Sequence, residues 1–399
     1  MLYYIGGLLA KYFGGHEENV PFYEKALRAV GRFLNSYAVL IVLAVYVGFF
    51  VTRYLLPCFF KYLPLDRGRD FTLSKEVSKG KPTGSGVVFV SFFVILSFIF
   101  APVDFSREGG TALFISQAGV LALTWLMMLT GYLDDRSEKG WGEYIKAFLD
   151  LLICAGASIL IALCLPRMSG SSSLYFWLPF VKDPVAVPFW LYIAISTVML
   201  WVSVNTTNCT DGVDGLSSSL VLLALMTLGI IFYIILGHQN IVLYLFVPQL
   251  KGMDGGNWQD FVPWIPFLKG GASWAIIIFT FAGVVMGYLW HNAFPSKVLM
   301  GDAGSRALGF FIGVCVMLSG NPLLFLITSS IIFINGGMGL LKVALKRFLH
   351  ISIFENVRFP LHDHMRKNHG WSPTQVLIKF LMIQILITIG MLGIFFKIR

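Results

Sequence analysis

Long apolar segments alternate with short polar ones along almost the whole chain. A transmembrane helix needs about 20 successive apolar residues. By that measure the pattern predicts ten spans, near residues 37–60, 84–101, 112–133, 145–165, 187–204, 214–236, 271–290, 304–319, 321–341 and 376–396. Residues 1–36, in which aromatic and basic side chains are interleaved, are interpreted as an N-terminal interfacial segment. The fold expected for residues 37–399 is a single all-α, ten-span integral membrane domain.

Composition supports a membrane protein and excludes a soluble one. Hydrophobic residues make up 57% of the chain and charged residues 13%, whereas about 25% of residues are charged in soluble domains. The five cysteines lack metal-ligand spacing and are interpreted as reduced thiols. The net charge of +9 is assigned to topology and to anionic membrane lipids, so no nucleic-acid partner is expected.

Basic residues divide the predicted loops into two sets. The loops that follow odd-numbered spans hold 17 Lys and Arg residues and the opposite loops hold 5, whereas the two termini add six basic residues to the second side. By the positive-inside rule the first set faces the cytoplasm and both termini are periplasmic. The cytoplasmic loops expected are 61–83, 134–146, 205–213, 291–306 and 341–375.

Three acidic clusters, far apart in sequence, all fall in loops of the cytoplasmic set. They are Asp134 with Asp135, Asp211 with Asp214, and Asp302. Five carboxylates in an apolar setting repel one another unless cations neutralise them. Mg²⁺ typically takes one or two protein carboxylates together with substrate phosphates. The clusters therefore predict one cytoplasmic cleft that uses magnesium.

Basic residues and glycines in the same loops extend this interpretation to phosphate. Carboxylates for a metal with lysines and histidines for phosphate are the usual components of phosphoryl transfer. Four glycines flank the acids at expected helix starts, where free backbone N–H groups can bind phosphate. The residues in question are Lys79, Lys81, Lys139, Lys146, His362, His364, Gly212, Gly215, Gly301 and Gly304.

Each element also has a plainer interpretation. Asp134 and Asp135 could end a helix in solvent, and Asp211 and Asp214 could cap one. Lys146 could anchor a loop at the cytoplasmic face or pair with Asp150 one helical turn later. The coincidence of all the clusters on one face favours the functional interpretation.

Three motifs resemble the polyprenyl-phosphate N-acetylhexosamine-1-phosphate transferases. They are Gly131-Tyr-Leu-Asp134-Asp135, the segment from Asn205 to Leu216, and the segment from Asn292 to Ser305. A fourth, Pro360-Leu-His362-Asp-His364, resembles the histidine motif of the phospho-N-acetylmuramoyl-pentapeptide transferase family. The resemblance covers nearly the whole chain, and the motifs follow in the family's order.

The resemblance implies a magnesium-dependent enzyme of the bacterial cytoplasmic membrane. Such an enzyme transfers phospho-N-acetylmuramoyl-pentapeptide from UDP to undecaprenyl phosphate, which gives lipid I and UMP, and works as a homodimer. The resemblance also implies roles for single residues. Asp302 is the expected magnesium ligand and Asp134 the candidate base. Asp135 and His362 are the further catalytic residues. The substrate-binding residues implied are Lys79, Lys81, Thr83, Lys146, Asn208, Asp211, Asp214, Asn292, Ser305 and His364.

At several positions the sequence departs from the pattern of the family. Asp363 interrupts the histidine motif, the segment from Ser78 to Gly86 lacks the first lysine of the family pattern, and Asp150 and Lys342 stand where glutamine is common.

Two mechanisms fit the sequence: direct attack by the lipid phosphate, and a covalent phosphosugar enzyme. Direct attack is favoured, because a carboxylate bound to magnesium is a poor nucleophile. The alternative functions are a sister transferase using UDP-N-acetylglucosamine and an ion-coupled transporter, whose sites usually lie near the bilayer midplane.

Overall fold

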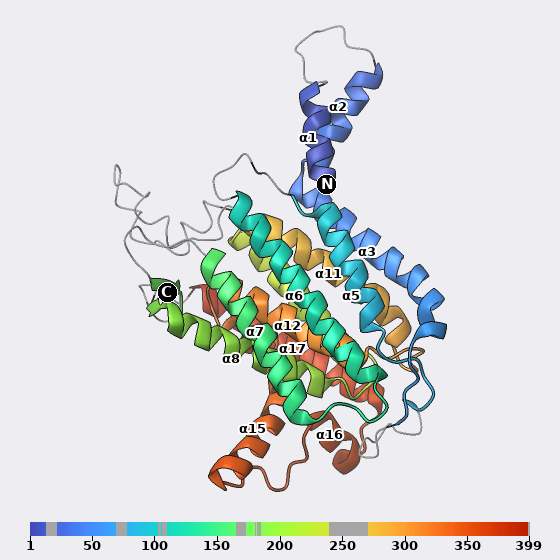
Figure 1. Cartoon of the computed structure of the whole chain (residues 1–399), viewed down its shortest axis with the longest axis vertical. Helices are drawn as coiled ribbons and strands as arrows, with labels where there is room; N and C mark the ends of the chain where they lie inside the picture. The colour runs from blue at the N-terminus through green and yellow to red at the C-terminus, as the bar shows by residue number, and fades with distance from the viewer. Residues whose placement is uncertain are drawn as a thin grey trace.

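Hydrocarbon offers no partners for backbone N–H and C=O groups, so a chain this apolar satisfies them inside helices. The computed structural model describes residues 1–12, 22–68, 78–102, 105, 110–164, 173–179, 181, 185–238 and 270–397. Figure 1 shows its elements: α1 (Leu2–Tyr12), α2 (Phe22–Leu34), α3 (Tyr37–Phe59), η1 (Phe60–Tyr62), α5 (Gly86–Phe100), α6 (Gly110–Arg136), α7 (Glu143–Cys164), β1 (Ser173–Phe176), β2 (Val185–Pro188), α8 (Phe189–Thr210), α9 (Leu216–Ile230), η2 (Ile231–Ile235), α11 (Gly271–Asn292), α12 (Gly301–Leu318), α13 (Leu324–Thr328), α14 (Ser330–Ile332), η5 (Phe333–Gly337), α15 (Met338–Ala344), η6 (Leu345–Leu349), α16 (Leu361–His369) and α17 (Pro373–Lys397).

Eight helical segments in the described residues are long and apolar enough to cross a membrane: Tyr37–Tyr62, Gly110–Arg136, Glu143–Cys164, Phe189–Thr210, Leu216–Ile235, Gly271–Asn292, Gly301–Leu318 and Pro373–Gly393. The other two predicted spans differ from this pattern. Helix α5 is apolar but only 15 residues long, and the segment predicted at 321–341 is broken into α13, α14, η5 and the start of α15. A mostly helical integral membrane protein is therefore confirmed, while the count of ten spans stays a prediction.

The broken segment is held by a glutamine from the last helix. At Ser329 the backbone leaves helical geometry (φ −134°, ψ 29°). Gln384 of α17 accepts a hydrogen bond from Ile331 N at 2.8 Å and donates one to Ile327 O at 2.8 Å. A helix break inside a membrane protein needs such partners, because freed backbone groups cannot turn to lipid.

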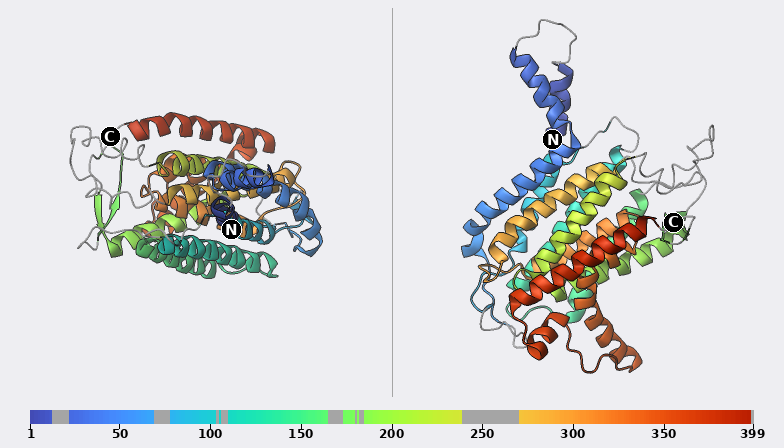
Figure 2. Two further views of the ribbon diagram at one scale, coloured as in Figure 1. Left: turned by 90° about the horizontal axis from the view of Figure 1, so that it is seen from above. Right: turned by 180° about the vertical axis from the view of Figure 1, so that it is seen from behind.

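Helix α12 lies at the centre of the bundle, and every residue from Asp302 to Leu318 is buried. It packs against α5, α6 and α8, while α11 packs against α3 and α9. Between them, the stacked rings of Phe93 and Phe281 lie 3.8 Å apart and Phe311 meets both edge-on. Helices α3 and α17 run along the outside of the bundle (Figure 2) and expose many apolar side chains. Their outer faces suit contact with lipid.

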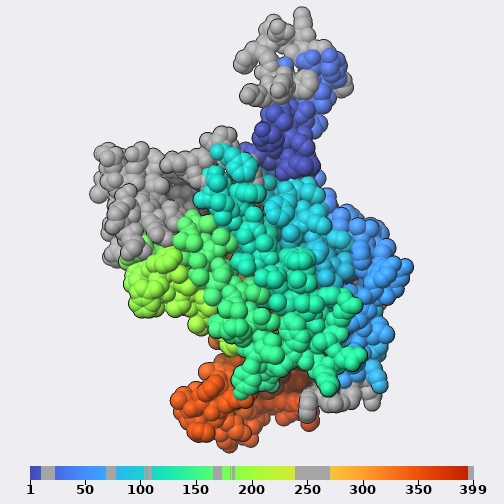
Figure 3. All heavy atoms as spheres, viewed as in Figure 1, coloured from blue at the N-terminus to red at the C-terminus, as the bar shows by residue number. Residues whose placement is uncertain are grey.

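Two parts project from opposite ends of the bundle (Figures 1 and 3). At one end α1 and α2 form a helical hairpin, anchored where the Met1 amino group donates to Ile99 O at 3.0 Å. At the other end lie α15 and α16. The interfacial location of residues 1–36 stays a prediction. The antiparallel pair β1–β2, which joins Ser173 to Pro188 and Phe176 to Val185, is a small departure from an all-α fold. The segment between the spans predicted at 214–236 and 271–290 lies almost wholly outside the described residues.

Helices extend into several of the predicted cytoplasmic loops. Helix α8 continues to Thr210, although a loop was predicted from 205; α7 already begins at Glu143, within the loop predicted at 134–146, and α12 at Gly301, within 291–306. In α8 the polar side chains bond back to the helix, because Asn205 donates to Trp201 O at 2.8 Å and Thr210 to Thr206 O at 2.8 Å. The boundary at 205 was therefore wrong: these polar side chains do not end the helix.

Candidate active site

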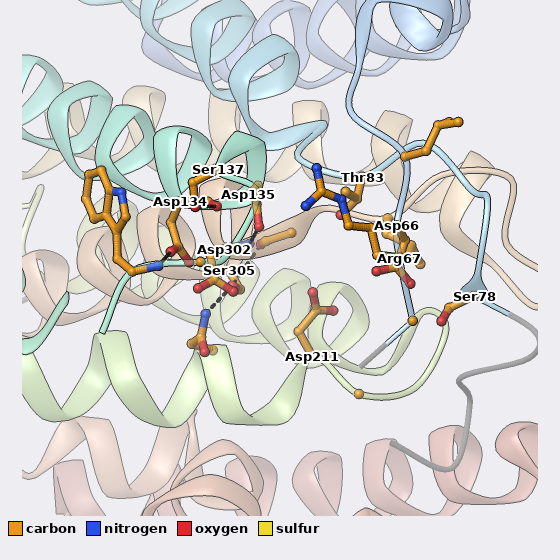
Figure 4. A pocket seen from close by; sticks show the side chains of 18 of the residues that line it. Asp66, Arg67, Ser78, Thr83, Asp134, Asp135, Ser137, Asp211, Asp302 and Ser305 are labelled. Carbon is orange, nitrogen blue, oxygen red and sulfur yellow. Dashed lines mark hydrogen bonds between the residues drawn. The ribbon is translucent and has the colours of Figure 1, made fainter. Parts of the chain in front are cut away.

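A cavity of about 440 Å³ lies where α6, α8 and α11 end and where α7 and α12 begin (Figure 4). It brings together the three acidic clusters, which are 76 or more residues apart in sequence. Its lining comprises Leu65, Asp66, Arg67, Gly68, Ser78, Thr83, Asp134, Asp135, Ser137, Glu138, Lys139, Gly140, Trp141, Lys146, Asn208, Asp211, Gly212, Val213, Asp214, Asn292, Leu299, Gly301, Asp302 and Ser305.

Asp135 binds the first turn of α12. Its Oδ1 accepts from Asp302 N and its Oδ2 from Ala303 N, each at 3.0 Å. Gly301 makes room for this contact, because it has a φ of +67° and a Cβ there would lie 2.2 Å from Asp135 Oδ2. A carboxylate at a helix N-terminus is stabilised by the exposed N–H groups and by the helix dipole. Asp135 thus fixes the place at which Asp302 enters the cavity.

Lys146 joins the carboxylates of two different helices. Its Nζ contacts Asp134 Oδ2 of α6 and lies 3.3 Å from Asp302 Oδ2 of α12. The other oxygen of Asp134 accepts from Trp141 N at 2.6 Å. Asp134 is 4% exposed and Asp302 6%, so these charges are little screened by solvent. The pairing of Lys146 with Asp150 considered above is not the one that the structure contains.

Asn208 and Ser305 connect α8 to the same turn of α12. Asn208 Nδ2 donates to Ser305 Oγ at 3.0 Å, and Ser305 Oγ donates to Gly301 O at 2.9 Å. Figure 4 shows Asp302 and Ser305 beside Asp134 and Asp135, with Asp211 between this group and Arg67. The end of α8 and the start of α12 are therefore held in a single arrangement around the cavity.

Asp214 and Asn292 build the turn before α9. Asp214 Oδ2 accepts from Ser296 N at 3.0 Å and lies 3.7 Å from Lys81 Nζ. Asn292 is buried; its Oδ1 accepts from Gly215 N at 3.0 Å and its Nδ2 donates to Val298 O at 3.0 Å. Both side chains serve the framework of the site as well as its lining.

Three of the four glycine N–H groups expected to bind phosphate already donate to the protein itself, while phosphate binding at Gly301 N stays a prediction. Asp135 takes those of Asp302 and Ala303, and Met300 O accepts from Gly304 N at 3.2 Å. Gly215 N donates to Asn292, and Gly212 N to Thr210 O at 2.9 Å. The prediction of phosphate binding by free N–H groups at Gly212, Gly215 and Gly304 was wrong, because neighbouring groups already accept those hydrogens.

The histidine motif and two lysines lie behind or beside the cavity and not in its lining. His362 is buried (2% exposed) and its backbone N donates to Asn335 Oδ1 at 2.8 Å. Burial, followed by the charge of Arg366, lowers the pKa of His362 to about 3. The ring is therefore neutral at physiological pH and packs against Gly212, where a Cβ would lie 2.3 Å from its Nε2. Its contact with the cavity runs through the loop that carries Asp211.

The remaining predicted residues divide in the same way. Thr83 lines the cavity, whereas Lys79, Lys81 and His364 do not. Lys79 is exposed, Lys81 Nζ donates to Ser296 Oγ at 2.9 Å, and His364 Nδ1 accepts from Arg358 N at 3.3 Å. The structure thus assembles the lining residues Thr83, Asp134, Asp135, Lys146, Asn208, Asp211, Asp214, Asn292, Asp302 and Ser305.

Several lining residues carried no signal by themselves. Asp66, Arg67 and Ser78 enter from the loop before Thr83, and Trp141 enters through its backbone N–H. Arg67 Nη1 donates to Glu138 O across the cavity mouth. The only available clue was their position in loops of the basic, cytoplasmic set. Loop conformation is set by tertiary contacts, so sequence spacing could not place them.

Comparison with known proteins now identifies the family. A sequence model described as glycosyl transferase family 4 matches residues 117–320. Phospho-N-acetylmuramoyl-pentapeptide-transferase from Treponema pallidum (strain Nichols) is 50% identical over 368 residues, which cover 92% of this chain and 93% of that protein. The chain belongs to the phospho-N-acetylmuramoyl-pentapeptide transferase family.

More distant members of this family show the same coverage. The enzyme of that name from Campylobacter jejuni (strain RM1221) is 28% identical over 375 residues, 88% of this chain and 95% of that protein. The one from Campylobacter hominis is 26% identical over 373 residues, 89% and 94% of the two chains. The resemblance of the motifs to this family is confirmed.

The charges of the lining favour a cation. Seven lining residues are acidic (Asp66, Asp134, Asp135, Glu138, Asp211, Asp214 and Asp302) and three are basic (Arg67, Lys139 and Lys146). No group of three or more His, Cys, Asp or Glu side chains in the described part of the chain is arranged to hold a metal by itself. The arrangement can hold a cation that also binds substrate phosphates.

Proposed function

We propose that this protein transfers phospho-N-acetylmuramoyl-pentapeptide from its UDP carrier to undecaprenyl phosphate, which yields lipid I and UMP. The observation that carries the proposal is the 50% identity to the Treponema pallidum transferase over 92% of the chain. The cavity supports it, because acidic and basic side chains at helix ends suit a reaction between two phosphates.

We further propose that the cavity uses Mg²⁺. The ammonium of Lys146 already stands between Asp134 and Asp302, so this pair of carboxylates accommodates a cation. Mg²⁺ prefers oxygen ligands and commonly takes one or two carboxylates with substrate phosphates. Asp302 is the first candidate ligand and Asp134 the second. When bound, the ion would neutralise the charge of the pyrophosphate during transfer.

The side chains support direct attack by the lipid phosphate. In that reaction a lipid-phosphate oxygen forms a bond to the β-phosphorus of the nucleotide, the bond to the α-phosphate oxygen breaks, and UMP leaves with the electron pair. Lys146 is placed to stabilise phosphate charge. Each oxygen of Asp134 accepts one contact, from Lys146 Nζ or from Trp141 N, and each keeps a second lone pair with which Asp134 could take a proton from the lipid phosphate.

The location proposed is the bacterial cytoplasmic membrane, with ten spans, periplasmic termini and a cavity that faces the cytoplasm. The cavity lies at the helix ends that connect to the basic loops, which supports this orientation. The family resemblance further implies a homodimer surrounded by membrane lipids.

An assay of UMP release tests the proposal. Purified protein with undecaprenyl phosphate and Mg²⁺ is offered UDP-N-acetylmuramoyl-pentapeptide or UDP-N-acetylglucosamine. We expect UMP only with the muramoyl nucleotide, loss of activity on chelation, and recovery on adding Mg²⁺. Asp302→Asn should lower kcat by about a hundredfold or more without loss of folded protein.

Three outcomes would contradict separate parts of the proposal. No UMP release with the muramoyl nucleotide would defeat the transferase assignment. Turnover with UDP-N-acetylglucosamine alone would favour the sister enzyme. Full activity in the presence of a chelator would remove the metal from the site.

A further inference from the structure

A second ion pair lies beneath the cavity, one helical turn deeper than Lys146 and Asp302. Arg306 Nε donates to Asp150 Oδ1 at 3.1 Å, and Nη2 contacts the same oxygen. Both side chains are 3% exposed. A buried ion pair is costly to form and is weak evidence for stability, so its presence beside the site invites another explanation.

The four charges have a regular arrangement on two facing helices. On α7, Lys146 and Asp150 are four residues apart; on α12, Asp302 and Arg306 are four residues apart. We call Lys146, Asp150, Asp302 and Arg306 the charge quartet. Residues four apart on a helix are neighbours, so each helix carries a cation and an anion that could pair with each other.

The quartet therefore has two possible pairings. Within the helices, Lys146 would pair with Asp150 and Asp302 with Arg306. The structure has the other arrangement, in which Lys146 pairs with Asp302 and Asp150 with Arg306. Only this pairing across the helices directs the Asp302 carboxylate towards Lys146 and the cavity.

Arg306 is a strong competitor for Asp302. It lies one turn away on the same helix, and its Nη1 is buried without a hydrogen-bond partner among the described residues. An arginine with donor capacity left can take a carboxylate with two N–H groups. The partner of Arg306 thus decides whether the Asp302 carboxylate is available to Lys146.

We propose that Asp150 is a positioning residue for the transfer reaction: by holding Arg306, it keeps Asp302 paired with Lys146 at the cavity. Arg306 has the complementary role, because it holds Asp150 away from Lys146. This inference rests on the proposed function, in which Asp302 and Lys146 act on the phosphates. It concerns two residues that do not line the cavity.

Three variants separate this role from simple helix packing. Asp150→Asn frees Arg306 to take Asp302, and Arg306→Gln frees Asp150 to take Lys146; the double variant leaves neither competitor. We expect each single variant to lose about tenfold or more in kcat, with KM for the nucleotide changed by less than about threefold. The double variant should recover to within about threefold of the wild-type kcat, because coupled charges give strongly non-additive effects.

The unfolding temperature in detergent provides a readout that does not depend on activity. Because each single variant can pair its remaining charges within one helix, both should fold and be at least as stable as the double variant. If the ion pair only joined α7 to α12, the single variants would bury an unpaired charge and be the least stable. Ser203→Ala is the matched control, since it removes another buried contact with α12, to Gly309 O at 2.6 Å, without a charge. It should lower the unfolding temperature and leave kcat unchanged.

The inference is overturned if Asp150→Asn keeps the wild-type kcat, if the double variant is no faster than the single ones, or if the single variants fail to fold while the double variant folds. An inactive wild-type protein would instead contradict the proposed function. In that case the order of unfolding temperatures still decides the pairing.

Discussion

Asp134 and Asp135 are adjacent in the chain and yet have different partners. Successive side chains of a helix point about 100° apart, so the two carboxylates face different neighbours. Asp134 meets Lys146 and Trp141 N, whereas Asp135 accepts two backbone N–H groups of α12. From the sequence alone, both residues are predicted to be catalytic. In the structure, Asp135 makes a supporting contact that anchors Asp302.

A single buried ring, that of His362, links the histidine motif to the loop that carries Asp211. Its pKa of about 3 lies below the ordinary value of 6.5. Between these values the unfolded chain binds a proton that the native ring does not. The ring therefore imposes no penalty on the native state above pH 6.5, and the native state is destabilised relative to the unfolded chain as the pH falls from 6.5 towards 3.

A comparison of wild type with His362→Gln tests this pH dependence. On lowering the pH from 7.5 to 5.5, we expect the unfolding temperature of the wild type to fall more than that of the variant. All other pH-dependent contributions to stability are common to the two proteins and cancel in the comparison. Equal falls in the two proteins would show that His362 is not held neutral by burial.

Among the elements, the break between α13 and α14 was not predicted from the sequence. The apolar run at 321–341 predicts one continuous span, because hydropathy cannot register a buried turn. The break is stabilised from α17, which is distant in sequence, by the hydrogen bonds of Gln384. A single glutamine in an apolar helix gave no indication of its partner.

Gln384→Leu should destabilise the protein by about 2 kcal/mol, since it leaves Ile331 N buried without its partner and leaves Ile327 O only the longer hydrogen bond from Thr388 Oγ1 at 3.3 Å. The free energy of unfolding in mixed micelles is the quantity to measure. Leu386→Ala is a control on the same helix, because its side chain is 70% exposed on the outer face. A Gln384 variant as stable as this control would remove the hydrogen bonds from the account of the break.

At the scale of the whole molecule, the cavity is assembled from segments that lie far apart in the chain. Counting spans placed all three acidic clusters on one face, and the cavity contains them all. This part of the site could be predicted because helices that cross a membrane alternate in direction, which fixes the side on which each loop emerges.

Labelling with a membrane-impermeant thiol reagent tests the proposed orientation. In a background without the five native cysteines, Lys139→Cys at the cavity rim should react in inside-out vesicles only. Val185→Cys on strand β2 should react only in the opposite orientation. Labelling of both variants from the same side would contradict the proposed topology.

The sequence by itself determined the helical membrane fold, the gathering of the acids at one end of the bundle and the family of the protein. These follow from local hydropathy, loop charge and motifs, each of which is complete within one segment of chain. Tertiary structure alone decided which partner each carboxylate binds: the backbone at the start of α12 for Asp135, Ser296 N for Asp214, and Arg306 in place of Lys146 for Asp150. Such choices depend on distances between side chains of different helices, which spacing along one helix does not contain.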